Sequence, residues 1–181
     1  HEMDRLSAPD CFESLGLAQG NYIVLTLHRP ANVDGEQHLA RTLEAIMQHA
    51  GSLPVVFPVH PRTAKQLEHI HTAWDHLHCV EPLPYLQFNY LVKHAKAVIT
   101  DSGGITEETT VMGIPCMTLR DSTERPETVD VGTNELIGTN PERIPPAMER
   151  LLSGQWKKGA IPEKWDGKAA ERIVEVLERC V

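Results

Sequence analysis

The sequence predicts an α/β fold built on a doubly wound parallel sheet, and three observations support this prediction. Short runs rich in β-branched residues alternate along the chain with segments of helical periodicity. The runs are apolar at nearly every position, as in parallel strands that helices cover on both faces. The chain has 181 residues, which is enough for one core of this kind.

In the first half of the chain, strand and helix candidates alternate three times. The strand candidates are continuous apolar runs at 22–27, 54–60 and 78–83. The helix candidates have apolar residues at helical spacing and lie at 35–50, 62–74 and 85–95. In the first of these helices, the residues predicted to form the buried face are Leu39, Leu43, Ile46 and Met47.

The second half of the chain continues the alternation. Its strand candidates lie at 97–100, 114–119 and 135–138. A helical segment follows Gly104, and two more helices are expected at about 141–153 and 168–179, with a linker over 153–168 between them. The last helix is expected to bury Ile173, Val174 and Leu177 and to serve packing.

The charge and the cysteine content narrow the possible functions. The formal net charge of -8, without a concentrated basic patch, argues against nucleic-acid binding. The four cysteines are far apart in the sequence, so we expect free, buried thiols in a reducing cytoplasm. We find no signal peptide and no apolar run near 18 residues, which favours a cytoplasmic protein that does not contact a membrane.

The start of the chain indicates a piece of a longer protein. The sequence begins His-Glu-Met, and strand-like sequence begins only near Tyr22. We therefore expect residues 1–19 to be a leading segment, helical or partly ordered, and residues 20–181 to be the folded domain.

Polar and basic residues follow four of the predicted strands at their carboxyl ends. They are His28, Arg29 and Asn32 after the first strand, His60 and Arg62 after the second, Asp101 and Ser102 after the fourth, and Arg120, Glu124 and Arg125 after the fifth. Right-handed crossovers bring these ends to one edge of the sheet, where doubly wound folds bind ligands. Ordinary solvated loops are an alternative, but the loops at the opposite edge lack this mixture. We expect a ligand site at this edge.

The stretch TDSGGITEE, residues 100–108, joins the fourth strand to a helix and allows two interpretations. Gly103 and Gly104 permit a positive φ and the close approach of a ligand, and the helix N-terminus offers unpaired N–H groups to a diphosphate. Alternatively, the segment is a capped turn in which Glu107 and Glu108 complement the helix dipole. It matches neither a P-loop nor a G-x-G-x-x-G motif, so spacing alone leaves both interpretations open.

Two further residues have both a functional and a structural explanation. The imidazole of His28, at a strand end, can orient or protonate a diphosphate leaving group, or it can satisfy nearby carbonyls. Arg125 can clamp phosphate oxygens, or it can form local salt bridges with Glu124 or Glu127.

Several motifs, read in order, resemble the carboxyl-terminal half of UDP-N-acetylglucosamine 2-epimerases. They are LTLHRPAN, PVHPR, EPLPYLQF, TDSGGITEE, RDSTERPET and WDGKAAERIV, and the resemblance runs from about residue 20 to residue 177. It implies one Rossmann-like half of a two-domain GT-B-type fold, with the active site in the cleft between the domains. Residues 20–181 would then be the UDP-binding domain of an isomerase of cell-surface polysaccharide biosynthesis.

The resemblance also implies roles for individual residues. His28 matches a catalytic histidine beside the diphosphate. The substrate-binding positions are Ser102, Gly103 and Gly104 for the diphosphate, Glu108 for the ribose, Arg125 for the substrate, and Leu83 and Phe88 for the uracil. Arg29 and His60 resemble positions that touch a second, regulatory UDP-GlcNAc in some bacterial members. Glu107 is then left to the helix dipole, and the departures from the family pattern are Ala31, Leu83 and Thr106.

The implied reaction eliminates UDP from UDP-GlcNAc to give a glycal and then adds UDP again with the opposite configuration at C2. It requires no cofactor and no metal. The carboxylates that move the C2 proton belong to an amino-terminal Rossmann-like domain, so we expect the chain alone to be inactive and the full-length protein to be a homodimer. Two alternatives stay open: the donor-binding half of a GT-B glycosyltransferase, and a nucleotide-sugar sensor without catalysis.

Overall fold

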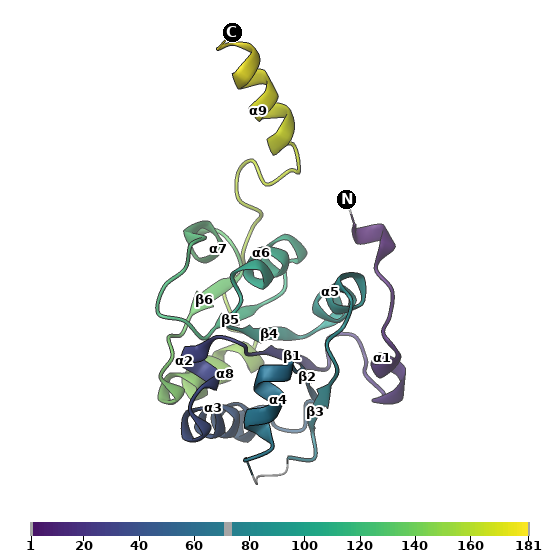
Figure 1. Ribbon diagram of the computed structural model, residues 1–181, viewed down its shortest axis with the longest axis vertical. Helices are drawn as coiled ribbons and strands as arrows, with labels where there is room; N and C mark the ends of the chain where they lie inside the picture. The colour runs from purple at the N-terminus through teal and green to yellow at the C-terminus, as the bar shows by residue number, and fades with distance from the viewer. Residues whose placement is uncertain (1, 71–73, 181) are drawn as a thin grey trace.

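The structure, a computed structural model, describes residues 2–70 and 74–180. Its centre is a six-stranded sheet with the order β3-β2-β1-β4-β5-β6, in which neighbouring strands are parallel (Figure 1). The strands are β1 (Ile23–Thr26), β2 (Val55–Pro58), β3 (Leu77–Val80), β4 (Ala97–Thr100), β5 (Cys116–Thr118) and β6 (Asn134–Leu136). Each overlaps a predicted strand, and the predicted doubly wound α/β fold class is confirmed.

Helices connect the strands and cover both faces of the sheet. They are α1 (Asp10–Ser14), α2 (Pro30–Val33), α3 (Glu36–His49), α4 (Pro61–Leu67), α5 (Tyr85–His94), α6 (Gly103–Met112), α7 (Pro126–Asp130), α8 (Ile144–Leu152) and α9 (Ala169–Glu178). Short 3₁₀ turns, η1 (Met3–Arg5) and η2 (Pro141–Arg143), precede α1 and α8. The sequence analysis missed α2 and α7, because five residues or fewer do not show a helical period.

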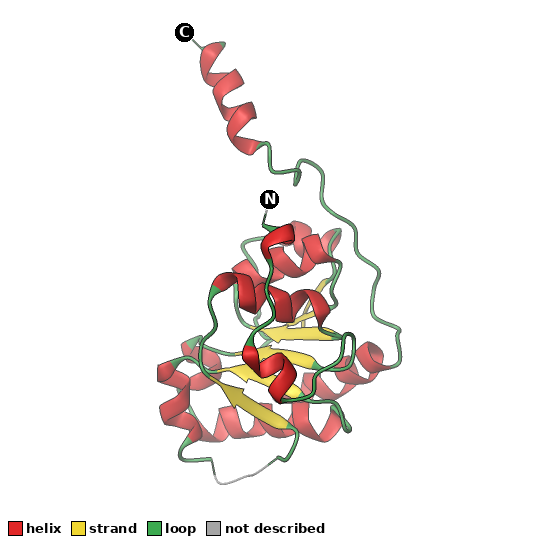
Figure 2. Cartoon of the chain, turned by 90° about the vertical axis from the view of Figure 1, so that its right-hand side faces the viewer, coloured by secondary structure: helices red, strands yellow, loops and turns green. Residues whose placement is uncertain are grey.

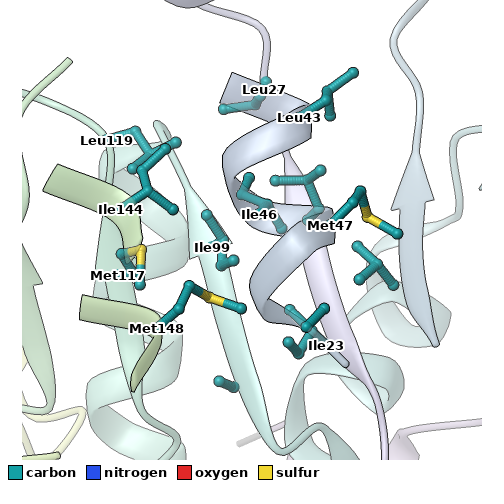
Figure 3. Close-up of a cluster of buried hydrophobic side chains, with 14 of the residues drawn as sticks. Ile23, Leu27, Leu43, Ile46, Met47, Ile99, Met117, Leu119, Ile144 and Met148 are labelled. Atoms are coloured by element: carbon teal, nitrogen blue, oxygen red, sulfur yellow. The ribbon is translucent and has the colours of Figure 1, made fainter. Parts of the chain in front are cut away.

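Two hydrophobic cores lie on opposite faces of the sheet, because successive strand residues point to opposite sides. The residues of the first core that Figure 3 labels are Ile23, Leu27, Leu43, Ile46, Met47, Ile99, Met117, Leu119, Ile144 and Met148. The second core contains Tyr22, Val24, Val56, Leu91 and Val98. Full burial of one such side chain contributes roughly 1.5–3 kcal/mol. The predicted buried face of α3 is confirmed, since all four of its residues belong to the first core.

The helix predicted over 62–74 ends much earlier, at Leu67. Beyond that residue the backbone closes in i→i−3 turns: the N–H of His69 donates to Gln66 O at 3.3 Å, and that of Ile70 donates to Leu67 O at 3.0 Å. Ile70 and Trp74 still pack against the first core. The apolar spacing therefore predicted burial correctly but helix length wrongly, and residues 71–73 of this prediction lie outside the described residues.

The last helix, α9, contradicts the prediction that its apolar face is buried. Ile173, Val174 and Leu177 are 59%, 52% and 60% exposed. After α8 the chain still contacts the domain as far as Ala160, whose N–H donates to Val131 O at 2.9 Å. Beyond that residue it leads away from the sheet, and α9 stands apart from the rest of the molecule in both views (Figures 1 and 2). Helical periodicity reports that one face is apolar, but it does not report what covers that face.

The cysteine prediction is correct about pairing and wrong about burial. All four cysteines are free, but Cys116 is the one that is buried, whereas Cys79 and Cys180 are exposed. Cys116 lies in β5 and belongs to the second core, whereas Cys79 lies in β3, at one edge of the sheet.

The leading segment contains η1 and α1, and α1 attaches to the second core. The ring of Phe12 makes edge-on contacts with Tyr22, at 6.0 Å between centroids, and with Tyr90, at 5.4 Å. Among the residues that the structure describes, none of the helices is long and apolar enough to span a bilayer.

Candidate functional site

The strand order changes direction between β1 and β4, and this is where doubly wound folds bind ligands. The two strands lie side by side at the centre of the sheet (Figure 1). The hydroxyls of Thr26 and Thr100 are 2.7 Å apart near their carboxyl ends. Asp101 directly follows Thr100, and His28 lies two residues after Thr26, so that His28 and Asp101 meet at the same point of the sheet edge.

Asp101 is fully buried and organises the loop that follows β1. Its carboxylate accepts hydrogen bonds from the backbone N–H groups of His28, at 3.1 and 3.2 Å, and of Arg29, at 2.9 Å. The side-chain amide of Asn32 donates to the same carboxylate at 3.1 Å and to Leu119 O at 3.0 Å. We call these four residues, Asp101, His28, Arg29 and Asn32, the Asp101 network.

The imidazole of His28 also belongs to this network. Its Nδ1 lies 2.9 Å from Asp101 Oδ1, while about half of the side chain is exposed. The hydrogen bond to Asp101 raises the pKa of His28, although partial burial opposes this effect. Because Nδ1 faces a carboxylate, we assign its proton there, which leaves Nε2 for an external partner.

The carboxylate of Asp101 stays ionised in this setting. Burial alone raises its pKa, but the hydrogen bonds from His28, Arg29 and Asn32 outweigh burial and hold the pKa below its ordinary value. The sequence analysis placed Asp101 at the ligand-binding edge without assigning it a role. Its position directly after a buried strand was the available signal.

The two candidate regulatory residues occupy different positions. The guanidinium of Arg29 donates through Nε to Asp101 O at 3.0 Å, so Arg29 is part of the Asp101 network. His60 follows β2, and its carbonyl accepts the N–H groups of Thr63 and Ala64 at the start of α4. The structure therefore places Arg29 beside the candidate catalytic residue and His60 on a neighbouring strand end.

Ser102, Gly103 and Gly104 form the start of α6. Ser102 is the N-cap, and within the described chain no side chain caps the first N–H groups of this helix. The positive φ that the glycines permit is not used, because both have ordinary helical φ values. The close approach is available, since a Cβ on Gly104 would meet nothing within 4 Å. The helix thus presents open N–H groups and a partial positive charge at the sheet edge.

A bidentate ion pair lies beside this helix start. The guanidinium of Arg120 donates to Glu124 at 2.6 and 2.8 Å, and a Cβ on Gly103 would lie 3.5 Å from Arg120 and 3.6 Å from Glu124. The hydrogen bonds from Arg120 lower the pKa of Glu124 to about 2, with a further contribution from the charge of Arg29. The sequence analysis listed Arg120 among the polar residues but did not identify this pair.

Arg125 pairs with a residue that the sequence analysis assigned differently. Its Nε donates to Glu107 Oε1 at 2.5 Å, and its Nη1 donates to Glu124 O at 3.1 Å. The assignment of Glu107 to the helix dipole is therefore wrong, because Glu107 lies beyond the first turn of α6 and holds Arg125. The local salt bridges considered for Arg125, with the side chains of Glu124 or Glu127, are replaced by this pair.

Glu108 contacts a different helix. Its Oε1 accepts a hydrogen bond of 2.6 Å from the hydroxyl of Tyr85, the first residue of α5. Leu83 and Phe88, the candidate uracil residues, precede and follow Tyr85 in the chain. Both are partly buried and pack against the second core. A cavity of about 150 Å³ lies between η1, α5 and α6, and both Tyr85 and Glu108 line it.

The structure thus brings most of the predicted site residues to one edge of the sheet. His28 and Arg29 share the Asp101 network, while Arg125 and Glu108 are held on the α6 side. Among residues 2–70 and 74–180, no group of three or more His, Cys, Asp or Glu is placed to hold a metal ion. The arrangement offers hydrogen-bond donors and positive charge to an anion, and a carboxylate to hydroxyl groups.

Comparisons with known proteins point to a single family. The family model described as UDP-N-acetylglucosamine 2-epimerase matches residues 3–178. A UDP-N-acetylglucosamine 2-epimerase of Methanocaldococcus jannaschii is 41% identical over 167 residues, which are 87% of this chain and 44% of that protein. The chain therefore spans about half the length of the curated relatives it matches.

Solved structures agree with this comparison. The structure of the Methanocaldococcus jannaschii UDP-GlcNAc 2-epimerase in complex with UDP-GlcNAc and UDP superposes with a TM-score of 0.75 and 36% identity, covering 94% of this chain and 49% of that one. The glycosyltransferase VinC in complex with dTDP has a TM-score of 0.64 over 96% of this chain and 45% of that one, but at 17% identity it shows the fold alone. The chain belongs to the UDP-N-acetylglucosamine 2-epimerase family.

Proposed function

We propose that this chain is the UDP-binding carboxyl-terminal half of a UDP-N-acetylglucosamine 2-epimerase. The observation that carries the proposal is the pair of His28 and Asp101 at the switch point of the sheet, in a chain that belongs to this family. The pair lies directly before α6, whose N-cap side chain makes no capping hydrogen bond. The relative from Methanocaldococcus jannaschii is in complex with UDP-GlcNAc and UDP in its solved structure. Residues 20–181 are the domain that we assign to UDP.

The diphosphate is bound at the N-terminus of α6. The backbone N–H groups of Gly103 and Gly104 are available to the diphosphate without a competing side-chain cap, whereas that of Ser102 donates to Thr100 Oγ1 at 3.0 Å and must exchange this bond for a phosphate oxygen. The open space beside Gly104 admits phosphate oxygens. Arg125 contributes positive charge to the diphosphate site, and its guanidinium gives up part of its hydrogen bonding to Glu107 when it contacts a phosphate oxygen.

The nucleoside is bound along the α5 side of the same helix. The carboxylate of Glu108 accepts hydrogen bonds from the ribose hydroxyls, because an ionised carboxylate accepts but does not donate. Leu83 and Phe88 flank the uracil with their half-buried apolar surface. The departure from the family pattern at Leu83 then leaves base recognition there to the backbone.

His28 assists the departure of UDP. Elimination removes the proton from C2 of the sugar, breaks the bond from C1 to the diphosphate oxygen and forms the C1–C2 double bond of the glycal. In its protonated form, which the hydrogen bond to Asp101 favours by raising the pKa, His28 keeps one proton on Nδ1 towards Asp101 and donates the other, on Nε2, to the leaving oxygen. Re-addition of UDP reverses these steps after the C2 proton has been delivered from the other face.

The remaining parts of the enzyme lie outside this chain. We assign the base that takes the C2 proton to an amino-terminal Rossmann-like domain, and we propose a homodimer for the complete enzyme. A regulatory UDP-GlcNAc that reached Arg29 would contact the Asp101 network directly, since Arg29 donates to Asp101 O. Neither a metal nor another cofactor has a role in the proposed reaction.

A titration tests binding, and a reconstitution tests catalysis. UDP added to the ¹⁵N-labelled chain is expected to shift the amide signals of Ser102, Gly103 and Gly104, and no shift at millimolar UDP would contradict the proposal. The chain alone is expected to give no UDP-ManNAc, whereas adding the amino-terminal half of a relative is expected to give conversion with C2 exchange in deuterated water. Sugar transfer to an acceptor without C2 exchange would instead identify a glycosyltransferase.

A further inference from the structure

Tyr85 is a residue that the proposed function does not use, and it contacts the proposed ribose-binding carboxylate. We propose that Tyr85 is a positioning residue that gives the site its preference for ribonucleotides, by fixing Glu108 in the orientation that accepts the ribose diol. This inference rests on the proposed function, because it assumes that Glu108 binds the ribose. It adds a residue from a second helix and a property, sugar selectivity, that can be measured separately from affinity.

The geometry joins two helices through one hydrogen bond. Tyr85 is the first residue of α5 and Glu108 lies in the middle of α6, 23 residues later in the chain. The phenol O–H donates to Glu108 Oε1 at 2.6 Å, which is the length of a bond to an ionised acceptor. A carboxylate on a partly exposed helix position would otherwise sample several rotamers.

The backbone of Tyr85 is held in place by a buried side chain of the same helix. The side-chain amide of Asn89, which is 2% exposed, donates to Tyr85 O at 3.1 Å. The ring of Tyr85, by contrast, is more than half exposed. A ring with so much surface in water contributes little to packing, so its hydroxyl contact is the main interaction that the side chain makes.

The remaining oxygen of Glu108 then decides what the site can bind. With Oε1 occupied by the phenol, Oε2 is oriented as an acceptor for a ligand, and a carboxylate accepts hydrogen bonds but cannot donate them. A ribose offers two hydroxyl donors, whereas a 2′,3′-dideoxyribose offers none and leaves the oriented oxygen unpaired. The hydrogen bond to Glu108 also raises the pKa of Tyr85 to about 12, so the phenol remains a donor at physiological pH.

A purely structural role for Tyr85 makes a different prediction. Tyr85 also lines the cavity between η1, α5 and α6, together with Met3 and Leu6 of the leading segment. If its function were to hold this leading segment in place, removing the hydroxyl would affect stability, and it would affect all nucleotides equally. Sugar selectivity separates the two explanations.

The experiment compares UDP with 2′,3′-dideoxyuridine diphosphate by calorimetry on the 181-residue chain. We expect Tyr85→Phe to weaken UDP binding about two- to tenfold, the effect of one hydrogen bond, and to change dideoxyuridine diphosphate binding by less than about twofold. In a Glu108→Ala background, Tyr85→Phe is expected to have no further effect on UDP binding. Tyr90→Phe, on the same helix but packed against Phe12, is the matched control and is expected to leave both affinities unchanged.

The outcomes separate the inference from the function on which it rests. Equal losses for both nucleotides, or an unchanged UDP affinity, would overturn the role of Tyr85 while leaving UDP binding intact. A wild-type chain that binds no UDP would overturn the proposed function, and the inference with it. The amide spectrum and melting temperature of Tyr85→Phe show whether the variant is folded, so a loss of binding cannot be confused with unfolding.

Discussion

The two sides of the candidate site are built in different ways. On the β1 side, a fully buried carboxylate, Asp101, holds two backbone N–H groups, an amide and an imidazole. On the α6 side, the ion pair of Arg125 with Glu107 is open to water, with side chains that are 49% and 38% exposed. The first side is fixed by hydrogen bonds that water cannot replace, and the second by contacts that water weakens.

This difference suggests that the β1 side orients the candidate catalytic imidazole, whereas the α6 side adapts to a ligand that enters and leaves. A catalytic imidazole must be held in one tautomer and one direction, which a buried network achieves at the cost of being essential to the fold. A diphosphate and a sugar, by contrast, must enter and leave, and exposed ion pairs can open for them because each is worth little in water. Four predictions test the contrast, beginning with the largest effect.

Removing Asp101 is expected to have the largest effect, and on stability. Asp101→Ala leaves the N–H groups of His28 and Arg29 without their acceptor, and we expect the free energy of unfolding to fall by about 3 kcal/mol or more in urea denaturation. Asp121→Ala is the control, because Asp121 also follows a strand but is exposed and accepts two long bonds from Thr139. Similar losses for the two variants would remove the contrast between the two sides of the site.

Removing Glu108 is expected to affect binding and leave stability nearly unchanged. Glu108→Ala should weaken UDP binding by about 1–3 kcal/mol, the value of hydrogen bonds to a charged acceptor. Calorimetric titration gives the affinity, and thermal melting gives the stability. A variant that binds UDP as tightly as the wild type would show that the ribose lies elsewhere.

The pH dependence of stability is expected to be smaller and to come from the Asp101 network. The raised pKa of His28 means that its contribution is complete below the ordinary value of 6.5 and is lost as the pH rises through the pKa of the folded state. The lowered pKa of Asp101 means that its contribution is present above 3.8 and is lost as the pH falls through its folded value.

Urea denaturation at about pH 6 and about pH 9 measures the histidine part of this dependence. We expect the free energy of unfolding to decline over this interval by less than about 1 kcal/mol, because half of the imidazole is exposed and solvent screens the pair. His28→Gln should remove the decline that His28 causes. A variant with the same slope as the wild type would assign the dependence to other groups.

The smallest effect is expected for Glu107. Glu107→Ala frees Arg125 from its partner, and we expect UDP affinity to change by at most about fivefold, the range of an exposed salt bridge, with stability unchanged. Assigning Glu107 to the helix dipole, as the sequence analysis did, implies little effect on UDP affinity, so a measurable change would favour the contact with Arg125. A change as large as that of Glu108→Ala would show that the α6 ion pairs are as essential as the buried network.

The sequence predicted the sheet and the edge of the site because both depend on local patterns. Continuous apolar runs identified the strands, and parallel pairing then required His28 and Asp101 to end at the same edge. The sequence could not predict that Asp101 accepts from Asn32, or that Glu107 rather than Glu124 pairs with the side chain of Arg125. These choices depend on side-chain directions and on the course of loops, which residue types do not determine.

The errors in the helices have a similar origin. The apolar spacing that predicted a helix over 62–74 was produced by residues that pack on the core from a turn, as Ile70 does. The apolar face of α9 is real, but in this chain its residues remain exposed. A periodic pattern therefore established which residues are apolar on one side, while the partner of that side had to be seen in the structure.

The pairing of β1 with β4 also has a consequence for how this protein folds. Thr26 and Thr100 are neighbours in space but 74 residues apart in the chain, so their contact must wait until a long loop has closed. Non-local parallel pairing of this kind slows folding. The first three strands could associate earlier as a unit, but they would contain His28 without Asp101. The candidate catalytic imidazole is therefore oriented only when the two halves of the sheet have met, which makes acquisition of the site a late event in folding.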